Sequence, residues 1–179
     1  MLNKATNGMH KGQYIIIAAR PGAGKTTFAE NVAFSAASMG KTVLFASAEM
    51  PGEDIYRRTL THMTGINLFF REEKLSETEK IEVDYAMKQL QKMKLFIHEF
   101  RSTGQLEAIL KEKHEKGKLP IDLVVVDYIQ LLDAKNPNYK SNYERVSAVS
   151  RELTAMAKSY KIPFLCCAQL GRGADGGSQ

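Results

Sequence analysis

A glycine-rich loop between an apolar run and a helical stretch constrains this chain more than any other feature. The run Tyr14 to Ala18 reads YIIIA, as is typical of a strand buried on both faces. The segment Thr26 to Met39 has the composition of a helix and stops at Gly40. The loop between them follows the phosphate-loop pattern G-x-x-x-x-G-K-[ST], except that Ala19 replaces its first glycine.

The residue types of this loop suit a triphosphate and its magnesium ion. Glycines at positions 22 and 24 let the backbone curl so that its N–H groups point at phosphate. Lys25 can reach the β and γ phosphates as a point charge, and Thr26 offers a hydroxyl to Mg²⁺. A glycine-rich turn with a chance lysine is the alternative, which the flanking strand and helix disfavour. We predict that ATP or a close relative binds to this segment: Arg20, Pro21, Gly22, Ala23, Gly24, Lys25, Thr26 and Thr27.

Apolar runs alternate with helical stretches along the rest of the chain. The further expected strands are Thr42–Ala46, Leu95–Ile97, Leu123–Val126 and Phe164–Ala168. The further expected helices are Asp54–Met63, Ser76–Met93, Leu106–Lys116 and Tyr143–Tyr160. This alternation predicts βαβ units, and therefore an α/β fold whose mostly parallel central sheet is flanked by helices. A length of 179 residues fits one domain with a substantial core.

Two patterns predict which side chains these elements bury. The helix that opens at the capping box Ser76–Glu79 has an apolar face that includes, in order, Ile81, Tyr85, Leu90 and Met93. Cys166 and Cys167 are neighbours in the last strand, so they point to opposite faces and are poorly placed to bridge each other. We expect two buried, reduced thiols, which suits a reducing compartment.

Polar residues follow four of the apolar runs, and parallel sheets bind ligands at the carboxyl ends of their strands. These segments are Ala19–Thr27, Ser47–Met50, Asp127–Gln130 and Gln169–Gly173. Asp127 ends one run, where a carboxylate beside a phosphate loop can serve Mg²⁺. Glu49 follows another run and can orient the water that attacks a phosphate, although a salt-bridged loop glutamate is an equal alternative. Gln169 can contact the γ phosphate, although a hydrogen-bonded loop glutamine explains it equally well.

The composition indicates an ordinary globular protein but does not identify a binding partner. Hydrophobic residues make up 44% and charged residues 25%, the balance of an ordinary globular protein. The sequence has no apolar run near the ~18 residues that a membrane span needs, and its polar start lacks a signal peptide, so we expect a cytoplasmic protein. The net charge of +5 permits a polyanionic partner but does not establish one. The four histidines have no metal-ligand spacing.

Taken together, the motifs AARPGAGKT, SAEM, VVVDYIQLL and CAQLGRG resemble the DnaB-type replicative DNA helicases, specifically their RecA-like, P-loop NTPase motor domain. The resemblance runs from about Leu2 to Gly173. It implies that Lys25 and Thr26 are the phosphate-loop pair, that Asp127 serves the magnesium, and that Glu49 is the catalytic base. It also implies that Gln169 is a γ-phosphate sensor.

The resemblance further implies a homo-hexameric ring that threads single-stranded DNA through its centre. The loops after Asp127 and after Gln169 would face the channel, where Lys135, Lys140 and Arg172 are the available basic residues. MgATP hydrolysis would drive translocation in DNA replication, with 5′–3′ polarity by resemblance. Primase and a helicase loader are the further partners that the family suggests, and no membrane is implied.

Three departures from the family pattern shape this expectation. The chain begins directly at the motor, without the family's N-terminal helical domain and linker helix. The strands and the arginine-finger type residues that follow the sensor in the family are absent, and Ala168–Arg172 reads AQLGR where the family usually has SQLSR. We therefore expect one motor domain over residues 1–179, incomplete at its C-terminal end. A RecA-type or clock-type ATPase, and a nucleotide-gated loader or binding module without turnover, remain as alternatives.

Overall fold

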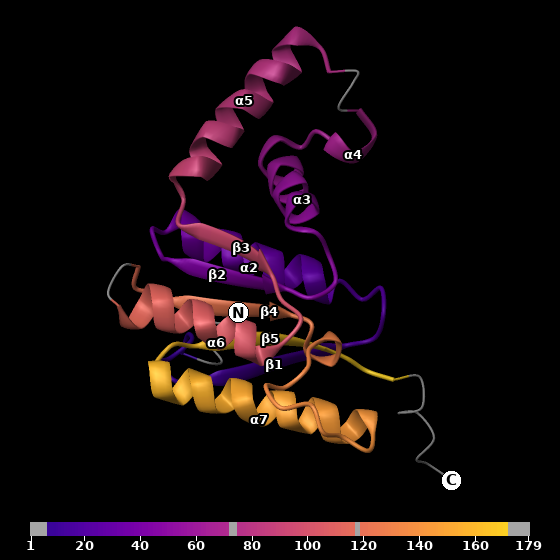
Figure 1. Ribbon diagram of the computed structural model, residues 1–179. Helices are drawn as coiled ribbons and strands as arrows, with labels where there is room; N and C mark the ends of the chain where they lie inside the picture. Colours follow the sequence, from indigo (N-terminus) through magenta and orange to yellow (C-terminus); the bar gives the residue numbers. More distant parts are fainter. Residues whose placement is uncertain (1–6, 72–74, 117–118, 172–179) are drawn as a thin grey trace.

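The computed structural model describes residues 7–71, 75–116 and 119–171 (Figure 1). A five-stranded sheet forms its centre, with the strands in the order β1-β5-β4-β2-β3 and every neighbouring pair parallel. The strands are β1 (Tyr14–Ala19), β2 (Val43–Ser47), β3 (Leu95–Glu99), β4 (Leu123–Asp127) and β5 (Phe164–Gln169). The predicted α/β fold with a parallel sheet is confirmed, and each expected strand is present.

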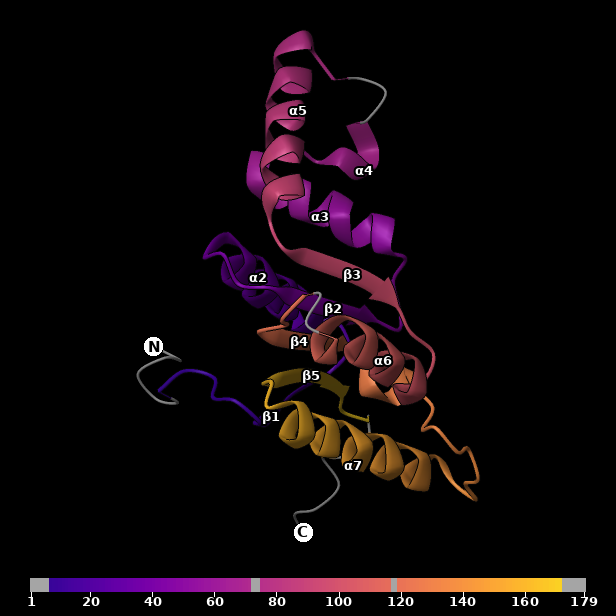
Figure 2. The ribbon, with the colours of Figure 1, turned by 60° about the vertical axis from the view of Figure 1, so that its left-hand side comes forward.

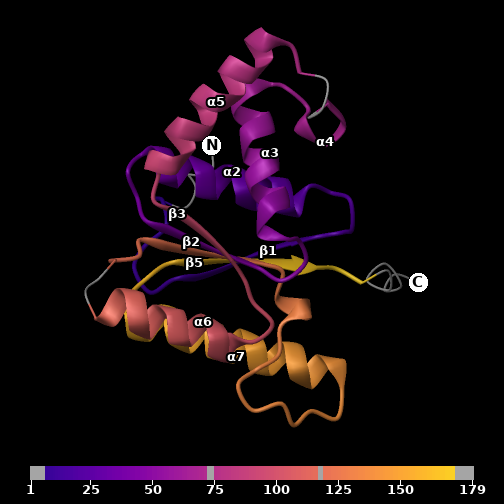
Figure 3. The same cartoon turned by 45° about the horizontal axis from the view of Figure 1, so that its top comes forward.

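Helices cover both faces of this sheet, as Figures 2 and 3 show. One face carries α2 (Lys25–Ser38), and beyond the β3 edge lie α3 (Gly52–Thr64), α4 (Leu68–Arg71) and α5 (Glu77–Lys92). The other face carries α6 (Thr103–Leu110), its π-helical continuation η2 (Lys111–Glu115) and α7 (Asn142–Tyr160). A 3₁₀ turn, η3 (Ile129–Leu131), follows β4. In the described part of the chain, no helix is long and apolar enough to cross a membrane.

The central strands β4 and β5 divide the core into two layers. Val124 and Cys166 point into the layer beneath α6 and α7, whereas Val125 and Cys167 point into the layer beneath α2. All four side chains are fully buried, and burying each of the two valines stabilises the fold by about 1.5–3 kcal/mol. Both cysteines are free thiols, as predicted from their adjacent positions.

Two predictions of burial were wrong, and tertiary packing explains both. We expected β1 to be buried on both faces, but β1 lies at the edge of the sheet and Ile16 is 48% exposed. The capping box of α5 is present, yet Ile81 and Tyr85 are 70% and 65% exposed. Leu90 of the predicted face is buried as expected, but α5 packs against α3 rather than across the sheet, so the residues buried with it are Val83 and Ala86.

Strand polarity gathers the predicted functional residues at one edge. All five strands run in the same direction, so their carboxyl ends share that edge. In the register of the sheet, Ala19 at the start of the phosphate loop pairs with Gln169, and Ser47 pairs with Asp127. The fold therefore places the ends of β1, β5, β4 and β2 side by side, where parallel sheets bind their ligands.

Candidate nucleotide-binding site

The loop between β1 and α2 takes the conformation that an anion-binding loop needs. Gly22 and Gly24 have φ angles of 76° and 86°, a left-handed region that side chains disfavour. A Cβ at either position would meet nothing within 4 Å, so the backbone angle and not crowding requires glycine. The first turn of α2 carries no acidic residue, so its N-terminal N–H groups and positive dipole end remain available to a phosphate.

Lys25 lies between two side chains that come from other strand ends. Its Nζ is 3.8 Å from Oε2 of Glu49 and 4.4 Å from the centre of the Tyr128 ring. The Lys25 side chain is only 10% exposed, whereas the Glu49 side chain is 48% exposed and can meet water. A cavity of about 510 Å³ opens beside them, and its walls are Gly22, Gly24, Lys25, Thr26, Thr27, Glu49, Met50 and Arg58. The structure thus brings the predicted lysine and the predicted base to one cavity.

Asp127 is buried at the end of β4, and one of its oxygens has no partner. The residue is 2% exposed, and its Oδ1 accepts no hydrogen bond from the described residues. Burial, and after it the nearby Asp127 carboxylate, raises the pKa of the Cys167 thiol to about 12, so this thiol stays protonated. An unpartnered carboxylate oxygen near the phosphate loop is the kind of ligand that Mg²⁺ prefers.

The oxygen atoms available near the phosphate loop suit Mg²⁺ better than a metal ion whose ligands all come from protein side chains. Among residues 7–71, 75–116 and 119–171 there is no group of three or more His, Cys, Asp or Glu side chains that could hold a metal ion. Mg²⁺ is usually bound through one or two protein groups, with water and substrate phosphates as its other ligands. Asp127 and the hydroxyl of Thr26, at the start of α2, match that requirement.

The glutamine at the end of β5 is held by a second glutamine. The Gln169 backbone N–H donates to Oε1 of Gln130 at 3.1 Å, and Nε2 of Gln130 donates to the Gln169 carbonyl at 2.9 Å. Regular pairing of β4 with β5 ends at Val126 and Cys166, so the Gln130 amide extends the contact past the end of the ladder. The backbone of the predicted γ-phosphate sensor is thereby tied to the turn that follows Asp127.

The basic residues expected to contact DNA lie apart from this cavity. Lys135 and Lys140 are exposed on the loop after η3, where Lys135 Nζ is 2.6 Å from Oε2 of Glu107. The backbone N–H of Lys140 donates to Glu144, and its side chain makes no ion pair within the described residues. Arg172 lies outside the residues that the structure describes.

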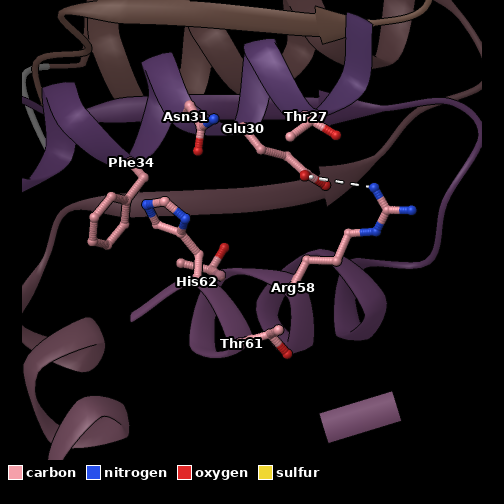
Figure 4. A pocket seen from close by; sticks show the side chains of 8 residues that line it. Thr27, Glu30, Asn31, Phe34, Arg58, Thr61 and His62 are labelled. Carbon is pink, nitrogen blue, oxygen red and sulfur yellow. Dashed lines mark ion pairs between the residues drawn. The ribbon is translucent and has the colours of Figure 1, made fainter. Parts of the chain in front are cut away.

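A second cavity, of about 290 Å³, adjoins the first between α2 and α3 (Figure 4). Glu30 and Arg58 point toward each other across it, with Nη1 of Arg58 3.7 Å from Oε2 of Glu30. The other oxygen of Glu30 has no hydrogen-bond partner among the described residues, and burial raises the pKa of this carboxyl. Arg58 and Thr27 line both cavities.

Sequence reasoning missed four residues around the site. Tyr128 and Gln130 stand within the quoted VVVDYIQLL motif, so their position beside Asp127 was a usable signal. Arg58 and Glu30 had no such signal, because they meet only through the packing of α3 against α2.

A parallel sheet with a phosphate loop after β1 and a buried carboxylate at the end of β4 is the arrangement of RecA-like P-loop folds. Residues 1–178 match the family model described as the DnaB-like helicase C terminal domain. The chain therefore belongs to this family, and the resemblance seen in its motifs is confirmed.

Relatives and solved structures agree with this assignment. The chain is 33% identical over 178 residues to the replicative DNA helicase DnaB of Buchnera aphidicola subsp. Acyrthosiphon pisum, and 37% identical over 180 residues to that of Mycoplasma genitalium. These alignments cover 97% and 96% of this chain but only 39% and 38% of the relatives. The chain thus spans about two fifths of the length of the curated relatives it matches.

Two solved structures share the fold. The ATPase domain of G40P superposes with a TM-score of 0.87 at 24% identity, over 96% of this chain and 62% of that one. A DnaB-like replicative helicase, solved in a study of its interactions with primase, superposes with a TM-score of 0.86 at 23% identity, over 96% of this chain and 42% of that one. The RecA-like fold is confirmed by both.

Proposed function

We propose that this chain is the ATPase motor of a replicative DNA helicase, which couples hydrolysis of MgATP to movement along single-stranded DNA in DNA replication. The observation that supports this most is the meeting of Lys25, Glu49 and the phosphate loop around one cavity, with buried Asp127 at the neighbouring strand end. Family membership supplies the biological setting, because the relatives are replicative DNA helicases.

Binding begins with the triphosphate in the loop Arg20–Thr27. Backbone N–H groups around Gly22 and Gly24 surround the phosphate oxygens, and the N-terminus of α2 adds its dipole. Lys25 then exchanges its 3.8 Å contact with Glu49 for the β and γ phosphates. Arg58 lines the same cavity and offers a second positive charge from α3.

Magnesium would be held by Asp127 and the Thr26 hydroxyl. Held there, the ion would supply positive charge that offsets the negative charge of the phosphates. The unpartnered Oδ1 of Asp127 is what supports this assignment.

Hydrolysis requires a group that takes a proton from the attacking water, and Glu49 can fill this role. As Lys25 turns to the phosphates, the Glu49 carboxylate becomes free to accept the water proton while the water oxygen bonds to the γ phosphorus and ADP leaves. Gln169, held at its backbone by Gln130, would sense whether the γ phosphate is present. A shift of Gln169 would move the turn after Asp127, and with it the loop that carries Lys135 and Lys140.

The wider assembly is proposed from the family. In a homo-hexameric ring, the loops after β4 and β5 would face a central channel, and Lys135, Lys140 and Arg172 would contact the DNA phosphates. Translocation with 5′–3′ polarity, a primase partner, a helicase loader and a cytoplasmic location belong to the same proposal. A DnaB-like helicase has been studied in its interactions with primase, which supports the primase partner.

Steady-state ATP hydrolysis by the full-length chain, with and without a single-stranded oligonucleotide, tests this function. We expect turnover that depends on Mg²⁺, rises several-fold with DNA, and is lost in Lys25→Ala. Lys41→Ala is a matched control, because Lys41 is exposed at the opposite end of α2 and should leave turnover unchanged. Tight MgATP binding without turnover would contradict the motor and favour a nucleotide-gated binding module.

A further inference from the structure

The short segment that carries Glu49 is held in place by hydrogen bonds from its neighbours. The hydroxyl of Ser47 donates to the Met50 carbonyl at 2.6 Å and accepts from the Met50 N–H at 3.1 Å, which closes a tight turn around Glu49. The N–H of Ala48 donates to the Asp127 carbonyl at 2.8 Å. The residue directly before the base is thus fixed on one side by the residue that would serve magnesium.

Arg101 contacts the next peptide, which joins Ala48 to Glu49. Its Nη1 donates to the Ala48 carbonyl at 3.1 Å, across 53 positions of sequence. Arg101 also lines a small cavity of about 60 Å³ together with Glu49. Ala48 itself is 5% exposed, and Arg101 reaches its carbonyl from an exposed position. A charged donor makes a stronger hydrogen bond than a neutral one.

The backbone of Arg101 is joined to the loop that follows η3. The Asp133 N–H donates to the Arg101 carbonyl at 2.9 Å, and the Thr103 N–H donates to the Asp133 carbonyl at 2.9 Å. Ser102 forms a parallel bridge with Asp133. Asp133 is the first residue of the loop 133–141, which also carries Lys135 and Lys140.

We propose that Arg101 is a positioning residue for Glu49, and that it links this base to the loop 133–141. The proposal rests on the function proposed above. A shift of the loop moves Asp133, and with it the Arg101 backbone. The Arg101 side chain then changes the place of the Ala48 carbonyl, one residue before Glu49. Binding of DNA phosphates to the loop would in this way change the position of the Glu49 carboxylate relative to the attacking water.

If Arg101 has this role, its loss should affect the rate of hydrolysis but not the affinity for nucleotide. Arg101 is absent from the walls of the phosphate cavity, which come from the loop after β1, the Glu49 turn and Arg58. Its removal should therefore leave nucleotide affinity intact while Glu49 loses its alignment. Misplacement of a reacting group by about 1 Å can cost about 100-fold in rate, and the Ser47 turn remains to limit the shift.

The test compares Arg101→Ala, Arg101→Lys and the control Arg151→Ala in the full-length chain. Arg151 is an exposed arginine on α7 for which the structure shows no hydrogen bond or ion pair within the described residues. Three quantities are measured for each variant: the Kd for MgATP, kcat without DNA, and the ratio of kcat with oligothymidylate to kcat without it.

We expect Arg101→Ala to lower kcat about tenfold, to reduce the DNA stimulation ratio toward one, and to leave Kd within about twofold of wild type. Arg101→Lys keeps one donor and should recover part of both losses. In a Glu49→Gln background, Arg101→Ala should cause little further loss of kcat, because both changes act through one group.

Several results would overturn the inference. An unchanged kcat in Arg101→Ala would show that Glu49 does not depend on Arg101, and an unchanged stimulation ratio would show that the loop does not act through it. A rise in Kd that matches the fall in kcat would indicate a general structural defect. A wild-type chain without turnover would instead contradict the proposed function itself, so the two failures are distinguishable.

Discussion

The hydrogen bonds between Gln130 and Gln169 give a prediction whose size follows from the structure. The side chain of Gln130 makes two hydrogen bonds, at 3.1 and 2.9 Å, to the backbone of Gln169. A hydrogen bond within a protein contributes about 0.5–1.5 kcal/mol net. Gln130→Ala should therefore lower the free energy of unfolding by about 1–3 kcal/mol. Each kcal/mol corresponds to a fall of about 2–4 °C in Tm for a chain of 179 residues.

A second variant isolates the donor of this pair. Gln130→Glu keeps the shape of the side chain and an acceptor for the Gln169 N–H. It also replaces the amide donor with a carboxylate oxygen that faces the Gln169 carbonyl. At neutral pH we expect this variant to lose at least as much stability as Gln130→Ala. Gln91→Ala, at an exposed position on α5, is the control and should change stability by less than about 0.5 kcal/mol.

Urea unfolding of the three variants and the wild type measures these differences, and ATP turnover of the same samples measures the effect on Gln169. We expect the two Gln130 variants to unfold at a lower urea concentration, with an unchanged dependence of the unfolding free energy on urea. We also expect their ATP turnover to be lower than that of wild type. A Gln130→Glu variant as stable as wild type would refute the reasoning, because the Gln130 donor would then contribute nothing.

Three further predictions follow from single side chains. Lys140→Ala should weaken binding of single-stranded DNA and reduce the slope of log affinity against log salt by about 0.7, and an unchanged slope would remove this residue from the interface. Burial raises the pKa of both Cys166 and Cys167, so neither should react with a thiol reagent at about pH 8 until urea unfolds the chain; rapid labelling of the native protein would contradict their burial. Burial also raises the pKa of Glu30, so the folded chain takes up this proton more readily than the unfolded chain does. Relative to Glu30→Gln, the wild type should gain stability as pH falls through the raised pKa and lose it as pH rises, whereas a difference that is constant with pH would argue against the shift.

Much of the sheet and the phosphate loop could be predicted from the sequence, because short-range patterns encode them. A continuous run such as Leu123–Val126 favours a strand, whereas the place of that strand in the sheet decides its burial, as exposed Ile16 in β1 shows. Left-handed backbone angles at Gly22 and Gly24 require glycine, so the loop is visible in its composition. Parallel strands then bring Asp127 and Gln169 to one edge without any further information.

The residues that packing brings together could not be predicted in this way. Apolar spacing on α5 is compatible with more than one buried stripe, and the position of α3 decides that Tyr85 faces outward. The contact between Arg101 and Ala48 joins two loops from neighbouring strands. The pair of Glu30 and Arg58 likewise depends on the angle between two helices, which no periodic pattern within either helix records.

The most direct test of the proposed motor is ATP turnover by Glu49→Gln, measured beside its affinity for MgATP and in the presence of single-stranded DNA. Glutamine keeps the shape of the side chain but cannot accept the water proton. We expect kcat to fall by about 100- to 10,000-fold while the Kd for MgATP stays close to that of wild type. Turnover by Glu49→Gln at the wild-type rate would show that Glu49 is not the base, and the arrangement of Lys25 and Glu49 around the cavity would then need another explanation.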